Sequence, residues 1–131
     1  MGGPSFDDPD IAYTTWFEYP YARIRTEIGI DRGDVEWFIA RLEYNTATGL
    51  NESDDWRQVA GFDHHPQADW GHDITADGLH LDIYREGKKT EVARGFPQVD
   101  LTNAVDFCQR FLRKNADELI EQFESWHGLR S

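Results

Sequence analysis

Histidines and aspartates crowd into one stretch of this chain, between Trp56 and Glu86. Four of the five histidines lie there, interleaved with five aspartates. Imidazoles beside carboxylates can hold a transition metal or transfer protons near neutral pH. Chemistry is therefore expected in this stretch, at His64, His65, His72 and His80 and at Asp63, Asp69, Asp73, Asp77 and Asp82.

One chemistry that these residues could perform is metal-free cleavage of RNA. A histidine with a carboxylate or a cation suffices, because an imidazole pKa near 6.5 lets the ring both accept and donate a proton. Arg57 or Arg85 would then bind phosphate. No residue can be assigned as a nucleophile from spacing alone. The candidate catalytic residues are Asp63, His64, His65 and His72.

The other chemistry is metal binding, because a zinc or nickel site needs only three such ligands and a water. His65, His72 and Asp73 are the candidate ligands of a divalent metal. Adjacent residues on a strand point in opposite directions, so His64 and His65 cannot both face one ion unless the chain bends there. Alternatively, these histidines are solvated loop residues or satisfy backbone groups.

Further residues are candidates for contact with a substrate or partner, and Arg57 and Arg85 belong to this group. Trp70, beside Gly71, could stack on a nucleobase or fill a partner's pocket, or pack under its own loop. His80 and Asp82 share a strand face about 6.5–7 Å apart, so both could line one wall. The spacing of the other tryptophans and of the single cysteine predicts core positions for Trp16, Trp37, Trp56, Trp126 and Cys108.

The elements that must position these residues begin with strands. Apolar and polar residues alternate with period two, and turn residues separate the alternating segments. Pro66 forbids simple continuation of the strand before it, so His64 and His65 lie where that strand ends. Asp77-Gly78 predicts a reverse turn. The predicted strands are 12–19, 22–30, 35–44, 56–63, 79–84 and a short edge strand at 90–93.

A helix follows the strands. From Val105 to Trp126 apolar residues recur every three or four positions, with Asp100 or Thr102 as N-cap and Gly128 beyond the C-terminus. Asn115 could start a second helix, but the apolar stripe keeps its phase there, which favours one long helix. Strands first and a helix last predict an α+β fold: an antiparallel meander of five to seven strands packed against one long C-terminal helix.

Length and charge set the remaining expectations. The 131 residues predict one domain over 12–131, after a disordered leader at 1–11. The single cysteine, the lack of a signal pattern and the lack of a long apolar run predict a cytoplasmic protein with no membrane contact.

The acidic balance admits two explanations. The chain has 25 acidic and 13 basic residues, a net charge of −12. Such a surface repels nucleic acid at low salt. In molar salt the Debye length is only about 3 Å, so an acidic, lysine-poor surface is also typical of a halophile. We favour the halophile over a functional acidic patch, in which case net charge does not exclude RNA as a partner.

The motif from Phe62 to Pro66, followed by His72-Asp73 and Gly78, resembles small prokaryotic toxins of the TumE type and related archaeal domains. The resemblance covers residues 34 to about 126. It implies a toxin–antitoxin module, a helix-turn-helix antitoxin as partner and RNA as target. The alternative from another class is a non-enzymatic interaction module, a homodimer through the sheet face bearing Val35, Trp37 and Ile39.

Overall fold

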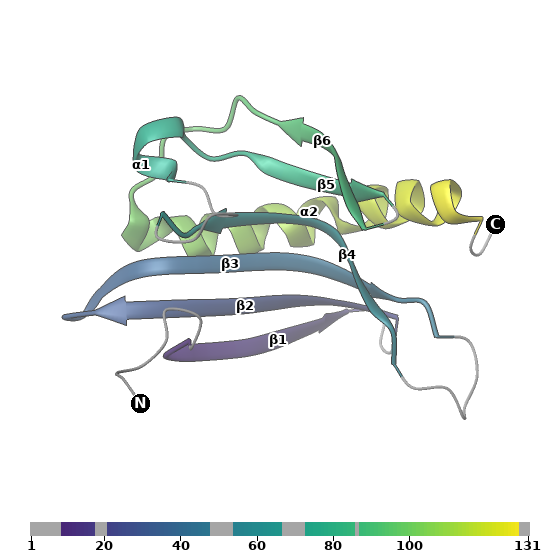
Figure 1. Ribbon diagram of the computed structural model, residues 1–131, viewed down its shortest axis with the longest axis horizontal. Helices are drawn as coiled ribbons and strands as arrows, with labels where there is room; N and C mark the ends of the chain where they lie inside the picture. Colours follow the sequence, from purple (N-terminus) through teal and green to yellow (C-terminus); the bar gives the residue numbers. More distant parts are fainter. Residues whose placement is uncertain (1–8, 18–20, 48–53, 67–72, 86, 129–131) are drawn as a thin grey trace.

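The computed structural model describes residues 9–17, 21–47, 54–66, 73–85 and 87–128. Six strands form one antiparallel sheet in which every strand pairs with the next along the chain (Figure 1). One long helix follows, so the predicted α+β meander with a C-terminal helix is confirmed. The elements are β1 (Ile11–Phe17), β2 (Ala22–Asp31), β3 (Asp34–Asn45), β4 (Trp56–His64), α1 (Ile74–Asp77), β5 (Leu81–Arg85), β6 (Lys88–Ala93) and α2 (Leu101–His127).

A two-residue turn joins the two long strands at the middle of the sheet. Asp31 pairs with Asp34, and Arg32 and Gly33 between them have φ of 53° and 86°. Positive φ at both central residues is the geometry of the tight hairpin turns that match strand twist. The turn lies between the predicted strands 22–30 and 35–44, and it fixes the register of β2 against β3.

α2 is a single helix of 27 residues, about 40 Å long at 1.5 Å per residue. It starts at Asp100, whose carboxylate accepts a hydrogen bond from the Asn103 amide at 3.0 Å. It ends at Gly128, which adopts a left-handed conformation. Asp100 is one of the two predicted N-caps, and Gly128 lies beyond the C-terminus as predicted. No second helix starts at Asn115.

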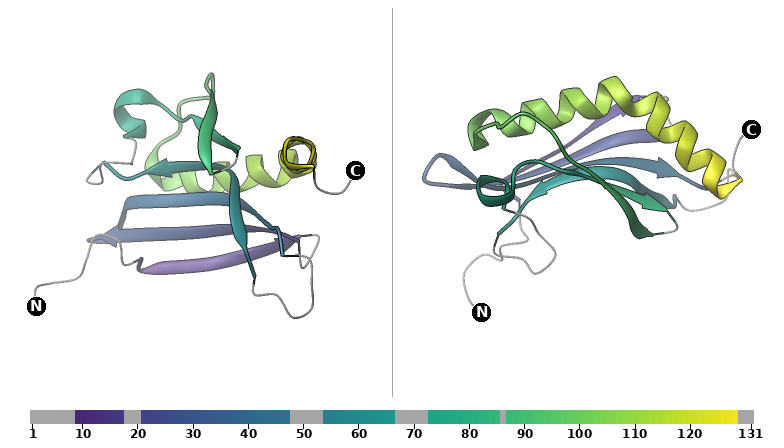
Figure 2. Two further views of the ribbon diagram at one scale, coloured as in Figure 1. Left: turned by 45° about the vertical axis from the view of Figure 1, so that its right-hand side comes forward. Right: turned by 90° about the horizontal axis from the view of Figure 1, so that it is seen from above.

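α2 covers one face of the sheet, as the view from above in Figure 2 shows. Alternate residues of β3 point toward it, and the Tyr44 hydroxyl donates a hydrogen bond to Glu124 at 2.8 Å. Cys108 and Leu112 of α2 are completely buried there, and burying a leucine contributes about 1.5–3 kcal/mol. This layer is the hydrophobic core.

The opposite face of the sheet, which α2 does not cover, is called the open face below. It is set by the strand register, because alternate residues of a strand point to opposite faces. The β3 residues that point to the open face are Trp37, Ile39, Arg41 and Glu43. The residues of the other strands on this face include Arg23, Arg25, Glu27, Gln58, Asp63, Asp82, Tyr84 and Lys89.

Two details differ from the sequence prediction. Trp16 is 45% exposed, so its assignment to the core is wrong. It lies on β1, which is the edge strand of the sheet within the described residues. Asp77-Gly78 is not a simple reverse turn, because it ends the short helix α1, with Gly78 at φ 77°. Asp10 bonds to β2 through its amide and its carboxylate; the leader at 1–11 and the domain bounds 12–131 stay predictions.

Candidate functional site on the open face

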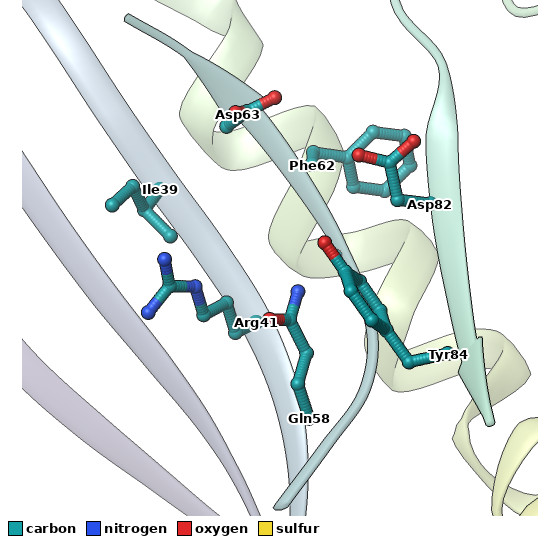
Figure 3. A pocket seen from close by; sticks show the side chains of 8 residues that line it. Ile39, Arg41, Gln58, Phe62, Asp63, Asp82 and Tyr84 are labelled. Carbon is teal, nitrogen blue, oxygen red and sulfur yellow. The ribbon is translucent and has the colours of Figure 1, made fainter. Parts of the chain in front are cut away.

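A pocket of about 140 Å³ opens on the open face where β3, β4 and β5 lie next to one another. Figure 3 shows that charged and polar side chains from all three strands surround it. The residues that line it are Ile39, Arg41, Gln58, Gly61, Phe62, Asp63, Asp82 and Tyr84.

Gly61 creates this pocket by having no side chain. Arg41, Gly61 and Asp82 form one row across three strands, so Gly61 leaves a gap between a cation and a carboxylate. A Cβ at Gly61 would lie 2.8 Å from the Gln58 amide nitrogen and 3.0 Å from the Ala40 carbonyl oxygen. Any larger residue would therefore push against the wall of the pocket.

Asp63 has the most altered acidity on this face. Its pKa is raised from 3.8 to about 6, first because burial disfavours the carboxylate and second because Asp82 carries a like charge nearby. His80, Lys89 and Arg41 oppose the rise. A carboxyl group with this pKa exchanges its proton near neutral pH, which is what a general acid or base requires.

Asp82 and Tyr84 form the β5 side of the pocket. Asp82 is 5% exposed, and its carboxylate forms an ion pair with the Lys89 ammonium at 3.2 Å. Burial, and then the charge of Asp82, raises the pKa of the Tyr84 hydroxyl, which therefore keeps its proton at neutral pH. In Figure 3 this hydroxyl and the Gln58 amide point to the middle of the pocket.

His64 lies on the other face of the sheet from Asp63. It pairs with Phe38 on the α2 side and is 3% exposed. Its Nδ1 accepts a hydrogen bond from the Ile74 amide at 3.1 Å, which holds the start of α1. Burial lowers its pKa, and the Asp73 carboxylate, 3.9 Å away, partly opposes this. The hydrogen bond to Ile74 gives His64 a structural role at the start of α1. A catalytic role for His64 stays a prediction.

His65 stacks on Trp37 with ring centroids 4.8 Å apart and is 1% exposed. The Trp37 indole in turn lies over Gly29, where a Cβ would come within 1.9 Å of the indole nitrogen. Trp37 and Ile39 are 3% and 6% exposed. These two side chains expose little area to a second subunit. The predicted homodimer stays a prediction, and their burial does not support an interface at this surface.

The predicted metal ligands are only partly placed. Asp73 is the N-cap of α1, where it accepts hydrogen bonds from Thr75 that lower its pKa. His72, like Trp70, lies outside the described residues. Within those residues, no three His, Cys, Asp or Glu side chains are grouped to hold a metal ion. The set His65, His72 and Asp73 therefore stays a prediction.

The two predicted phosphate-binding arginines lie away from Asp63. Arg57 pairs with Asp55 at 3.2 Å and is six residues from Asp63 on β4, about 20 Å along the strand. Arg85 lies over the Trp126 ring at 5.4 Å, on the α2 side. Neither lines the pocket.

Sequence reasoning thus found part of the site and missed part. The structure brings predicted Asp63, His80 and Asp82 close enough for the latter two to alter the acidity of Asp63. It adds Arg41 and Tyr84, which the sequence does not single out. Two sequence patterns could have found them: one face of the strand changes from apolar to polar at Arg41, and Tyr84 shares a strand face with Asp82. Only the strand register shows that these residues lie at one pocket.

These features define a class: an antiparallel six-stranded sheet with a helix on one face and a polar pocket lined by charged side chains on the other. The chain belongs to the family described as Domain of unknown function (DUF7718), whose family model matches residues 6–129. Searches of curated proteins and of solved structures found no match. Across the described ranges, no helix combines the length and apolarity needed to cross a membrane.

Proposed function

We propose that this protein cleaves RNA by proton transfer at the open-face pocket, with Asp63 as the proton acceptor. The observation that carries the proposal is the Asp63 carboxyl group, whose pKa of about 6 suits proton transfer. It shares one pocket with the guanidinium of Arg41 and the hydroxyl of Tyr84. RNA suits such a set, because its own 2′-hydroxyl supplies the nucleophile.

The reaction would proceed by internal transfer. The Asp63 carboxylate takes the proton of the ribose 2′-hydroxyl, and the 2′-oxygen forms a bond to the adjacent phosphorus. The bond from phosphorus to the 5′-oxygen breaks, and that oxygen takes a proton from water. The Asp63 carboxyl then gives its proton to the remaining hydroxide, which restores the carboxylate. The products are a 2′,3′-cyclic phosphate and a free 5′-hydroxyl. The protonated Tyr84 hydroxyl donates a hydrogen bond to a phosphate oxygen during the transfer.

The biological setting we propose is the two-gene module that the TumE resemblance implies, with a helix-turn-helix antitoxin as partner. That part rests on the motif from Phe62 to Pro66 and on His72-Asp73. The pocket supports only the chemistry, because its residues suit proton transfer and do not bear on the choice of a protein partner.

The test is cleavage of a fluorescent RNA oligonucleotide in the presence of a chelator. Asp63→Asn should lower the rate by about 10²–10⁴-fold, the usual contribution of a positioned acid or base. Asp117→Asn is the matched control, because Asp117 is exposed on α2. Replacing the ribose at the cleaved position by deoxyribose should abolish cleavage.

Two results would overturn the proposal. One is equal cleavage by wild type and Asp63→Asn. The other is an equal loss of rate in Asp63→Asn and Asp117→Asn, since a general loss would not depend on the pocket.

A further inference from the structure

Two arginines face each other across β2 and β3 on the open face. Arg25 pairs directly with Arg41, and both side chains are half-buried. Directly opposed residues in an antiparallel pair have Cβ atoms about 4.5–5.5 Å apart, and like charges there destabilise the sheet. The pair therefore has an electrostatic cost that a bound anion would remove.

The neighbouring cations on this face have carboxylate partners. Arg23 lies 2.7 Å from Glu43, and Lys89 lies 3.2 Å from Asp82. Arg25 lies 3.4 Å from Glu27 and also donates to the Thr14 hydroxyl at 3.2 Å.

Arg41 differs from these neighbours. Within the ranges that the structure describes, its guanidinium makes no ion pair and no side-chain hydrogen bond. In a chain with 25 acidic residues, a half-buried arginine opposite a second arginine keeps its five donors available to a ligand.

The position of Arg41 fits a ligand that reaches Asp63. Figure 3 shows its guanidinium at the rim of the pocket beside Ile39, on the opposite side from Asp82 and Tyr84. Ile39 pairs with Asp63 and lies two residues from Arg41, about 7 Å along β3. Arg41 and Asp63 therefore lie on the same part of the open face, where one extended ligand could contact both of them.

We propose that Arg41, with Arg25 opposite it, binds a phosphoryl group on the open face. Guanidinium groups bind phosphate through two parallel hydrogen bonds, which a lysine ammonium cannot do. The identity of the phosphate rests on the proposed function: in RNA cleavage it is the phosphate beside the 2′-hydroxyl that Asp63 deprotonates. A free phosphate and a backbone phosphodiester both present anionic phosphoryl oxygens, so Arg41 could bind either of them.

The test is a binding titration of the full chain with inorganic phosphate and, separately, with a 2′-deoxy oligonucleotide that cannot be cleaved. Arg41→Gln should weaken binding at least tenfold. Arg41→Lys, which keeps the charge and guards against a failure to fold, should weaken it less. Arg113→Gln is the control, because Arg113 is exposed on α2, and it should change binding less than twofold.

The outcomes separate the two proposals. Loss with both ligands assigns the site to a phosphoryl group in general, and loss with the oligonucleotide alone assigns it to a backbone phosphodiester. Equal binding by wild type and Arg41→Gln, or equal weakening in Arg41→Gln and Arg113→Gln, would overturn the site. If binding depends on Arg41 but no RNA is cleaved, the site stands and the proposed cleavage fails.

Discussion

At the scale of single residues, the raised pKa of Asp63 affects the stability of the fold as well as the proposed chemistry. Its pKa in the folded chain, about 6, lies above the ordinary 3.8. The folded state therefore favours the protonated carboxyl, and this stabilisation is complete below pH 3.8 and is lost as the pH rises to about 6. The shift corresponds to at most about 3 kcal/mol.

Asp63→Asn should consequently be more stable than wild type at pH 7, by about 1–3 kcal/mol, and nearly equal to it at pH 4. The gain arises because asparagine carries no buried charge. Urea unfolding at both pH values measures it, with Asp117→Asn as control. A variant that is less stable than wild type at pH 7 would contradict the stated cause of the shift.

The residue scale also shows what a sequence can and cannot predict. Asp63 and Asp82 were found because their residue types suggest chemistry. Arg41 was not, because an arginine on a half-polar strand face has no special appearance until its neighbours are known. Gly61 carries no signal at all, since its role is the absence of a side chain between Arg41 and Asp82.

At the scale of elements, His64 connects the end of β4 to the start of α1. Its Nδ1 accepts the Ile74 amide proton in a buried position. His64→Ala should destabilise the fold by about 1–3 kcal/mol, because the amide is left without its acceptor. Denaturant unfolding measures the loss, and Glu121→Ala, at an exposed position of α2, is the reference. A loss below that of the reference would contradict this role.

The elements themselves were largely predictable. α2 was predicted because its caps, Asp100 and Gly128, and its apolar phase agree with one another. α1 was not, because four residues are too few to show a helical period. The exposure of Trp16 was also missed, since the periodicity of a strand does not show whether it lies at the edge of the sheet.

At the scale of the whole molecule, a net charge of −12 should make stability depend on salt. Repulsion among surface carboxylates is screened as the Debye length falls from about 10 Å at 0.1 M to about 3 Å at 1 M. We expect the midpoint of thermal unfolding to rise by about 3–5 °C or more over this range, equivalent to about 1 kcal/mol.

Calorimetry at several concentrations of sodium chloride measures this rise, and sucrose serves as an uncharged comparison. An unchanged midpoint in sodium chloride would contradict the salt-adapted interpretation of the composition. The fold class would not be affected, because it follows from the strand and helix periods and not from net charge.

The most direct test of the central claim is a carboxyl-carbon NMR titration of Asp63 in wild type and in Asp82→Asn. The pocket predicts a midpoint of about 6 in wild type. It predicts a lower midpoint in the variant, because the like charge of Asp82 is gone. A midpoint near 3.8 in both proteins would contradict the claim that the open face holds a proton-transfer group.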